Sequence, residues 1–228
     1  VTVIINTTAA PTGSSSQTFC AGATVSNLLA TGTAIQWYDA AIGGNLLSGG
    51  TILANGTTYY AAQTVSGCVS TARLAVTVNV STVAAPTGSS SQSFCGSTVV
   101  ANLAANGVNI QWYDSPSGGN LVSGGTTVNN GTTYYATQTI SGCESQTRLA
   151  VTVTIIPYPN EPTGNASQSF CSSATVANLT AVGTGIQWYA AQGGNPLLSS
   201  TSLTNGATYY ATQTVSGCES PTFLAVTV

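Results

Sequence analysis

The sequence contains no histidine, no lysine and no methionine, and only 3% of its 228 residues are charged. About 25% is usual in a soluble domain. The two basic residues are Arg73 and Arg148 and the net charge is -3, so the chain cannot neutralise a row of phosphates. Nucleic acid and a polybasic membrane contact are therefore excluded as natural partners.

Groups that could perform catalysis are equally scarce. General acid–base chemistry needs a titratable side chain of suitable pKa, and only five carboxylates are present, with no two close together in sequence. Calcium sites need six to eight oxygen ligands, and only Glu161 lies near a predicted domain junction. We therefore expect no enzyme activity, no catalytic residues, no metal site and no cofactor. The five carboxylates are Asp39, Asp114, Glu144, Glu161 and Glu219.

Long apolar runs are also absent: none approaches the roughly 20 residues needed to span a bilayer, and no signal peptide is present. The six cysteines nevertheless indicate an exported protein, because they are even in number and have no histidine or Cys-x-x-Cys partner for a metal. An exported chain without a signal peptide is expected to be a fragment of a longer protein.

The sequence consists mainly of one module that is repeated three times. The motif Ile-Gln-Trp-Tyr contains the only three tryptophans, and a cysteine lies 17 residues before each of them. A second cysteine follows 31, 31 and 30 residues after them. Residues 9–83, 84–159 and 160–228 are predicted as three repeats. Residues 1–8 are predicted as the end of a preceding repeat, because Val1-Thr2-Val3 matches Val76-Thr77-Val78.

Each repeat has a β pattern without helical periodicity. In the first repeat, strands are predicted over 24–28, 34–39, 58–65 and 73–80, with a tight turn at Ser66-Gly67. Short strands in about 75 residues are typical of a β-sandwich. The fold class is therefore predicted to be all-β, with three tandem sandwiches of the immunoglobulin or fibronectin-III type in an extended array.

The spacing Leu53-x-x-Gly56-x-x-Tyr59 has the form of a tyrosine corner, in which the phenol hydroxyl bonds to the backbone upstream. It recurs in the other two repeats. Ile35 and Trp37 are predicted to face the core, whereas Gln36 and Tyr38 face outward. The predicted core aromatics are Trp37, Trp112, Trp188, Tyr59, Tyr134 and Tyr209.

The cysteines are predicted to form one disulfide in each repeat: Cys20–Cys68, Cys95–Cys143 and Cys171–Cys218. Pairing between neighbouring repeats is the alternative. The outward tyrosines could pack across strands or could bind a sugar or a protein, since aromatic platforms suit sugar rings. These candidate binding residues are Tyr38, Tyr60, Tyr113, Tyr135, Tyr189 and Tyr210.

The strings Ile-Gln-Trp-Tyr-Asp, Gly-Gly-Asn, Thr-Thr-Tyr-Tyr, Ser-Gly-Cys and Leu-Ala-Val-Thr-Val together resemble the Ig-like repeat of surface and secreted proteins of Bacteroidetes. The resemblance covers nearly all of the three repeats, although Ala190 replaces the aspartate in the third. Proteins of this type often carry a gliding-motility-associated, type IX secretion sorting domain. The resemblance implies an exported, cell-surface, adhesin-like array.

The sequence thus predicts a structural or adhesive segment of a bacterial surface adhesin, with gliding motility as one setting. A polysaccharide-binding module and a spacer of a secreted multidomain enzyme are the alternatives. The expected partners are neighbouring repeats and an extracellular polysaccharide or surface ligand. The fragment itself is expected to be monomeric.

Overall fold

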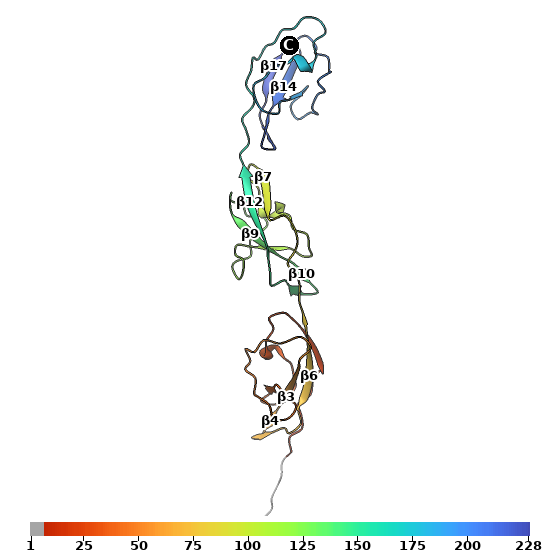
Figure 1. Ribbon diagram of the computed structural model, residues 1–228, viewed down its shortest axis with the longest axis vertical. Helices are drawn as coiled ribbons and strands as arrows, with labels where there is room; N and C mark the ends of the chain where they lie inside the picture. Colours follow the sequence, from red (N-terminus) through yellow and green to blue (C-terminus); the bar gives the residue numbers. More distant parts are fainter. Residues whose placement is uncertain (1–6) are drawn as a thin grey trace, which may run out of the picture. The chain divides into compact units, whose positions relative to one another are not determined.

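The computed structural model describes residues 7–228 (Figure 1), and its regular elements are strands and short 3₁₀ turns. The predicted match of Val1-Thr2-Val3 to a preceding repeat falls outside the described residues. By its internal contacts the chain divides into two compact units. One comprises the first repeat with Ala105–Leu121 and Tyr135–Leu149, and the other Ser89–Ala104, Val122–Tyr134 and Ala150–Val228. The second repeat therefore contributes to both units.

The first repeat is built on a four-stranded sheet in the order β1-β6-β3-β2. Strand β6 pairs antiparallel with β3 and parallel with β1. A separate two-stranded hairpin, β4–β5, is inserted between β3 and β6. The strands are β1 (Ser16–Cys20), β2 (Gln36–Tyr38), β3 (Thr58–Ala62), β4 (Thr64–Val65), β5 (Cys68–Val69) and β6 (Leu74–Ser81).

One face of this sheet carries the core. Val76 and Val78 of β6 are fully buried, as the alternation of apolar and polar residues predicts. Trp37 lies opposite Ala61 in the β2–β3 register, and the small, fully buried alanine leaves space beside the indole. Trp37 is only 7% exposed. The alternating pattern of Ile-Gln-Trp-Tyr therefore points its tryptophan into the core.

The second repeat uses the same elements, and the third lacks only the first strand, of which an isolated bridge from Ser167 to Thr227 remains. The second sheet has the order β7-β12-β9-β8 and the third β13-β14-β17. The second repeat contains β7 (Ser91–Cys95), β8 (Gln111–Tyr113), β9 (Thr133–Thr137), β10 (Thr139–Ile140), β11 (Cys143–Glu144) and β12 (Leu149–Ile156). The third contains β13 (Gln187–Tyr189), β14 (Thr208–Thr212), β15 (Thr214–Val215), β16 (Cys218–Glu219) and β17 (Leu224–Thr227).

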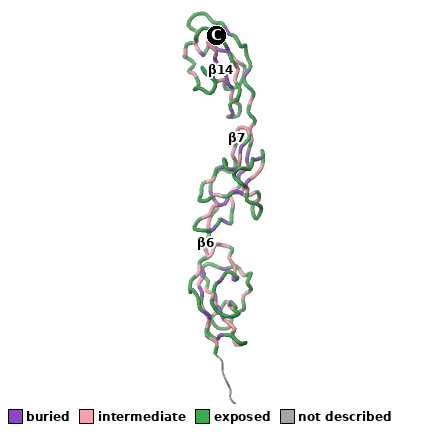
Figure 2. Tube along the Cα trace, turned by 180° about the vertical axis from the view of Figure 1, so that it is seen from behind, coloured by how far each residue is buried: buried purple, intermediate pink, exposed green. Residues whose placement is uncertain are grey.

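The layer that faces each sheet consists mainly of turns and isolated bridges, such as Thr12 with Thr31 and Thr24 with Ile52. The strand predicted over 24–28 is wrong, because a 3₁₀ turn, η1 (Val25–Asn27), occupies it. The Thr24 N–H donates to Asn27 Oδ1 at 2.8 Å, which favours the turn over an extended strand. The equivalent turns are η2 (Val100–Asn102) and η3 (Val176–Asn178). Figure 2 shows the buried residues in short stretches between exposed loops.

Other local expectations hold with shorter bounds. The strand predicted over 34–39 is β2, and the one predicted over 58–65 is interrupted at Gln63 between β3 and β4. The tyrosine corner is present in the first and third repeats: Ala54 N–H donates to the Tyr59 hydroxyl at 2.9 Å, and Thr204 N–H donates to the Tyr209 hydroxyl at 2.9 Å. Among residues 7–228, no helix has the length and apolar character needed to cross a membrane.

Candidate functional site

In the first and second repeats the two cysteines lie toward opposite ends of the longest strand. Cys20 ends β1 and is paired with Ser81, the last residue of β6. Cys68 begins β5, shortly before β6 starts at Leu74. Because a strand rises about 3.3 Å per residue, the length of β6 places Cys20 and Cys68 on the order of 20 Å apart.

The disulfides therefore join neighbouring repeats. Cys20 is bonded to Cys143 with the Cα atoms 5.3 Å apart, and Cys95 is bonded to Cys218 with the Cα atoms 5.6 Å apart. The predicted bridges within repeats are wrong, because a disulfide cannot join Cα atoms more than about 7 Å apart. The rejected pairs are Cys20–Cys68, Cys95–Cys143 and Cys171–Cys218. There are two bridges and not one per repeat, and within the described residues Cys68 and Cys171 remain as thiols.

The path of the chain explains which ends meet. The chain enters the first repeat beside the β4–β5 hairpin, which contains Cys68. Gln63 Nε2 donates to Ala9 O at 3.0 Å, and Thr8 Oγ1 donates to Cys68 O at 3.1 Å. The second repeat repeats this contact, from Gln138 Nε2 to Ala84 O at 3.0 Å. The chain leaves each of these repeats along β6 or β12, beside Cys20 or Cys95. Each bridge thus joins the exit end of one repeat to the entry end of the next.

Glycines allow close approach at both junctions. A Cβ on Gly22 would lie 2.6 Å from Nε2 of Gln146 in the second repeat. A Cβ on Gly96 would overlap the ring of Tyr158, which lies between Pro157 and Pro159 in the second linker. Both glycines also have positive φ, a conformation that disfavours a side chain. The junctions are therefore closely packed as well as bridged.

The outward tyrosine face of the first repeat is occupied by an arginine. Tyr38 lies opposite Tyr60 in the β2–β3 register. The guanidinium carbon of Arg73 lies 3.6 Å from the Tyr38 ring centroid, and Arg73 Nη1 donates to Gly43 O at 2.8 Å and also to Ala40 O. Arg73 therefore connects the loop that contains Gly43-Gly44, here called the Gly-Gly loop, to the sheet: its hydrogen bonds reach the loop and its cation–π contact reaches β2.

The second repeat has the same arrangement. Arg148 lies 3.7 Å from the Tyr113 ring centroid, and its Nη1 donates to Gly118 O at 2.9 Å. The Tyr113 hydroxyl also donates to Glu144 Oε1 at 2.8 Å. Burial and the hydrogen bond to the Glu144 carboxylate raise the pKa of Tyr113 above its ordinary value.

In the third repeat Phe223 takes the place of the arginine. Its ring meets Tyr189 and Tyr210 edge-on, with centroids 6.0 and 6.3 Å away. Tyr189 is buried, at 6% exposure, and its hydroxyl donates to Glu219 Oε1 at 2.6 Å. Burial, and then this bond, raise the pKa of Tyr189. The other five candidate binding tyrosines are half-buried: Tyr38, Tyr60, Tyr113, Tyr135 and Tyr210.

The aspartates after β2 and β8 brace the same loops. Asp39 Oδ1 accepts from Asn45 N at 2.7 Å and its Oδ2 from Asn45 Nδ2 at 2.9 Å. These two bonds lower the pKa of Asp39. Asp114 does the same with Asn120, at 2.8 and 3.0 Å. The carboxylates therefore hold turns, and Ala190 lacks this brace in the shorter loop of the third repeat.

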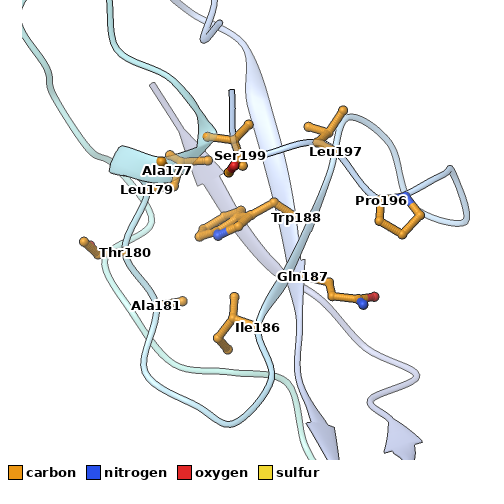
Figure 3. A pocket seen from close by; sticks show the side chains of 11 residues that line it. Ala177, Leu179, Thr180, Ala181, Ile186, Gln187, Trp188, Pro196, Leu197 and Ser199 are labelled. Carbon is orange, nitrogen blue, oxygen red and sulfur yellow. The ribbon is translucent and has the colours of Figure 1, made fainter. Parts of the chain in front are cut away.

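A pocket of about 510 Å³ opens beside Trp188 in the third repeat, and one of about 410 Å³ beside Trp37 in the first. In Figure 3 the Trp188 indole lies among Ile186, Ala177 and Leu179, whereas Gln187 points away. The lining mixes apolar side chains with the uncharged polar residues Thr180, Gln187 and Ser199, and it carries no charged group. The pocket is a gap between the sheet and its opposing turns.

Within residues 7–228, no three histidine, cysteine, aspartate or glutamate side chains are grouped to hold a metal.

The sequence agrees with one known family over nearly its whole length. The family model of the Ig-like domain associated with CHU_C matches residues 9–81, 84–157 and 159–228. A search of curated proteins finds no match to the chain. The domains detected are Ig-like repeats, a type that is not typically catalytic.

Proposed function

Since the chain belongs to the family of CHU_C-associated Ig-like domains, we propose that it is a stalk segment of a bacterial cell-surface protein, in which disulfides lock each repeat to the next. The observation that supports this most is the pairing of Cys20 with Cys143 and of Cys95 with Cys218. Disulfide-bonded Ig-like repeats suggest an exported protein. An adhesin exported by type IX secretion, and used in gliding motility, is the setting we propose.

The two bridges divide the covalent chain in an unusual way. Three stretches of polypeptide, 20–95, 95–143 and 143–218, each run from one bridge to the other. Three covalent connections therefore cross this region, and the shortest of them becomes taut first when the chain is pulled. One broken peptide bond in any of the three leaves the molecule in one piece.

The shortest connection, 95–143, limits how far the chain can extend. Residues 21–94 and 144–217 cannot be drawn out fully while both bridges are intact. On the chain-entropy model, closing a loop with a sequence separation of 123 contributes about 5 kcal/mol to stability. Small sandwiches with cores of this size are marginal by themselves. The bridges thus supply both stability and a limit on extension, which suit a stalk.

Polysaccharide binding by the tyrosine faces has less support. Arg73 and Arg148 cover the rings of Tyr38 and Tyr113, and Tyr189 is buried. A free aromatic platform would leave these rings open to a sugar. A spacer in a secreted enzyme would use the same bridged junctions. That role differs from the stalk only in the domain to which the repeats are attached.

Single-molecule stretching tests the proposal. Pulled by its two ends without reductant, the protein should extend only through residues 1–20, 95–143 and 218–228. Reduction should raise the maximum extension about threefold, because every residue then contributes its full length. A Cys143→Ser/Cys218→Ser variant should reach the same length without reductant, whereas Cys68→Ser should behave like the parent. Full extension of the oxidised parent would contradict the proposal.

A further inference from the structure

Cys68 lies in a hairpin whose backbone matches those of the bridged cysteines. The turn before it has φ values of 48° at Ser66 and 81° at Gly67. The turn before Cys143 has 50° and 80°, and the turn before Cys218 has 51° and 83°. Positive φ at both central residues defines the tight turn that presents the following cysteine. The hairpin thus has the bonding conformation whether or not a disulfide is present.

Cys171 is the counterpart of Cys20 and Cys95. All three follow a phenylalanine in the sequence Phe-Cys and precede a 3₁₀ turn by the same spacing. Cys20 and Cys95 each bond the cysteine of a Ser-Gly-Cys hairpin in another repeat. Cys171 is exposed and Cys68 is partly exposed. One molecule therefore carries both halves of the junction bridge as thiols, at positions whose equivalents are bonded in the same structure.

We propose that Cys171 and Cys68 are the two halves of a further junction bridge, each bonding the complementary cysteine of another repeat of this type, and that two copies of this chain supply these halves to each other under oxidising conditions. This inference rests on the proposed function, because it extends the junction bridge to a partner outside the chain. Copies of this chain should then be linked head to tail under oxidising conditions and separated by a reductant.

The reaction needs an oxidant, and a low-molecular-weight disulfide such as oxidised glutathione suffices. The Cys171 thiolate attacks one glutathione sulfur and releases the first glutathione thiolate. The Cys68 thiolate of the second molecule then attacks the mixed disulfide at Cys171 and releases the second. One protein disulfide forms, one glutathione disulfide is reduced to two thiols, and the protons lost by the cysteines are taken up by the glutathiones.

Two complementary variants test the pairing. Cys68→Ser retains only the Cys171 thiol and Cys171→Ser only the Cys68 thiol, so each can form no more than a homodimer. The variants, one with a mass tag, are mixed in equal amounts and oxidised with glutathione disulfide. Random pairing gives heterodimer as half of all dimers. We expect heterodimer several-fold above both homodimers together, and a ladder of oligomers from the parent protein.

Heterodimer at or below half of the dimers, or no dimer at all, would overturn the inference. The existing bridges are mapped in the same samples before oxidation. Intact Cys20–Cys143 and Cys95–Cys218 without a preferred heterodimer would refute the inference alone. Loss of those bridges in favour of pairs within repeats would instead refute the proposed function.

Discussion

Arg73 stacks on Tyr38, with its guanidinium carbon 3.6 Å from the ring centroid, while its Nη1 bonds two carbonyl oxygens of the Gly-Gly loop. Replacing Arg73 with alanine should loosen this loop by about 1–2 kcal/mol, since it removes a cation–π contact and two charged hydrogen bonds. Hydrogen exchange at the Asn45 amide should accelerate about tenfold. Arg73→Lys should give a smaller acceleration, and unchanged exchange in Arg73→Ala would contradict the stated role.

The junction bridge predicts that replacing Cys143 lowers stability and that replacing the equivalent Cys68 does not. Cys143→Ser should lower the free energy of unfolding by about 3–5 kcal/mol, because it opens a long closed loop. Cys68→Ser is the matched control and should leave it unchanged, since Cys68 carries a thiol. Chemical denaturation without reductant measures both. A large loss in Cys68→Ser would indicate the pairing within repeats.

The tyrosine corner can be tested by deleting one oxygen. Tyr59→Phe removes the acceptor of the Ala54 N–H and should destabilise the first repeat by about 1–2 kcal/mol. Tyr60→Phe changes the adjacent, half-buried tyrosine and is the control. Local unfolding measured by hydrogen exchange at Val76 reports on the repeat. Equal effects of the two substitutions would contradict the assignment of the corner.

Acid should loosen the loops that Asp39 and Asp114 brace. The bonds from Asn45 and Asn120 lower the pKa of these carboxyl groups in the folded protein. A depressed pKa contributes stability that is present above the unfolded value, about pH 4, and is lost as the pH falls through the folded value. NMR titration of the two carboxyl carbons should therefore show midpoints below 3.9. Midpoints at or above that value would contradict the brace.

The sequence predicted those features that local patterns determine. Alternation in Ile-Gln-Trp-Tyr predicted the buried Trp37, the Leu-x-x-Gly-x-x-Tyr spacing predicted the bond to Tyr59, and Ser66-Gly67 predicted the tight turn. Each depends on residues within a few positions of one another. The turn at Val25–Asn27 was missed because the β-branched Thr24 and Val25 favour a strand and masked the pairing of Thr24 with Asn27.

The disulfide pairing could not be predicted in the same way, because it depends on the direction of β1. An antiparallel β1 would have brought Cys20 to the Leu74 end of β6, near Cys68. The observed parallel pairing carries Cys20 to Ser81 instead. Period-two alternation is identical in both directions. The contact of Arg73 with Tyr38 was missed for a related reason, since it joins a loop to a strand 35 positions away.

Tryptic digestion without reduction tests the junction bridges most directly. The chain has no lysine, so trypsin cuts only after Arg73 and Arg148 and yields 1–73, 74–148 and 149–228. The thiols are first alkylated and the protein is unfolded without reductant. With Cys20–Cys143 and Cys95–Cys218 present, the three pieces should remain one covalent species and separate only on reduction. Three separate pieces before reduction would contradict the account, because bridges within repeats leave each piece on its own.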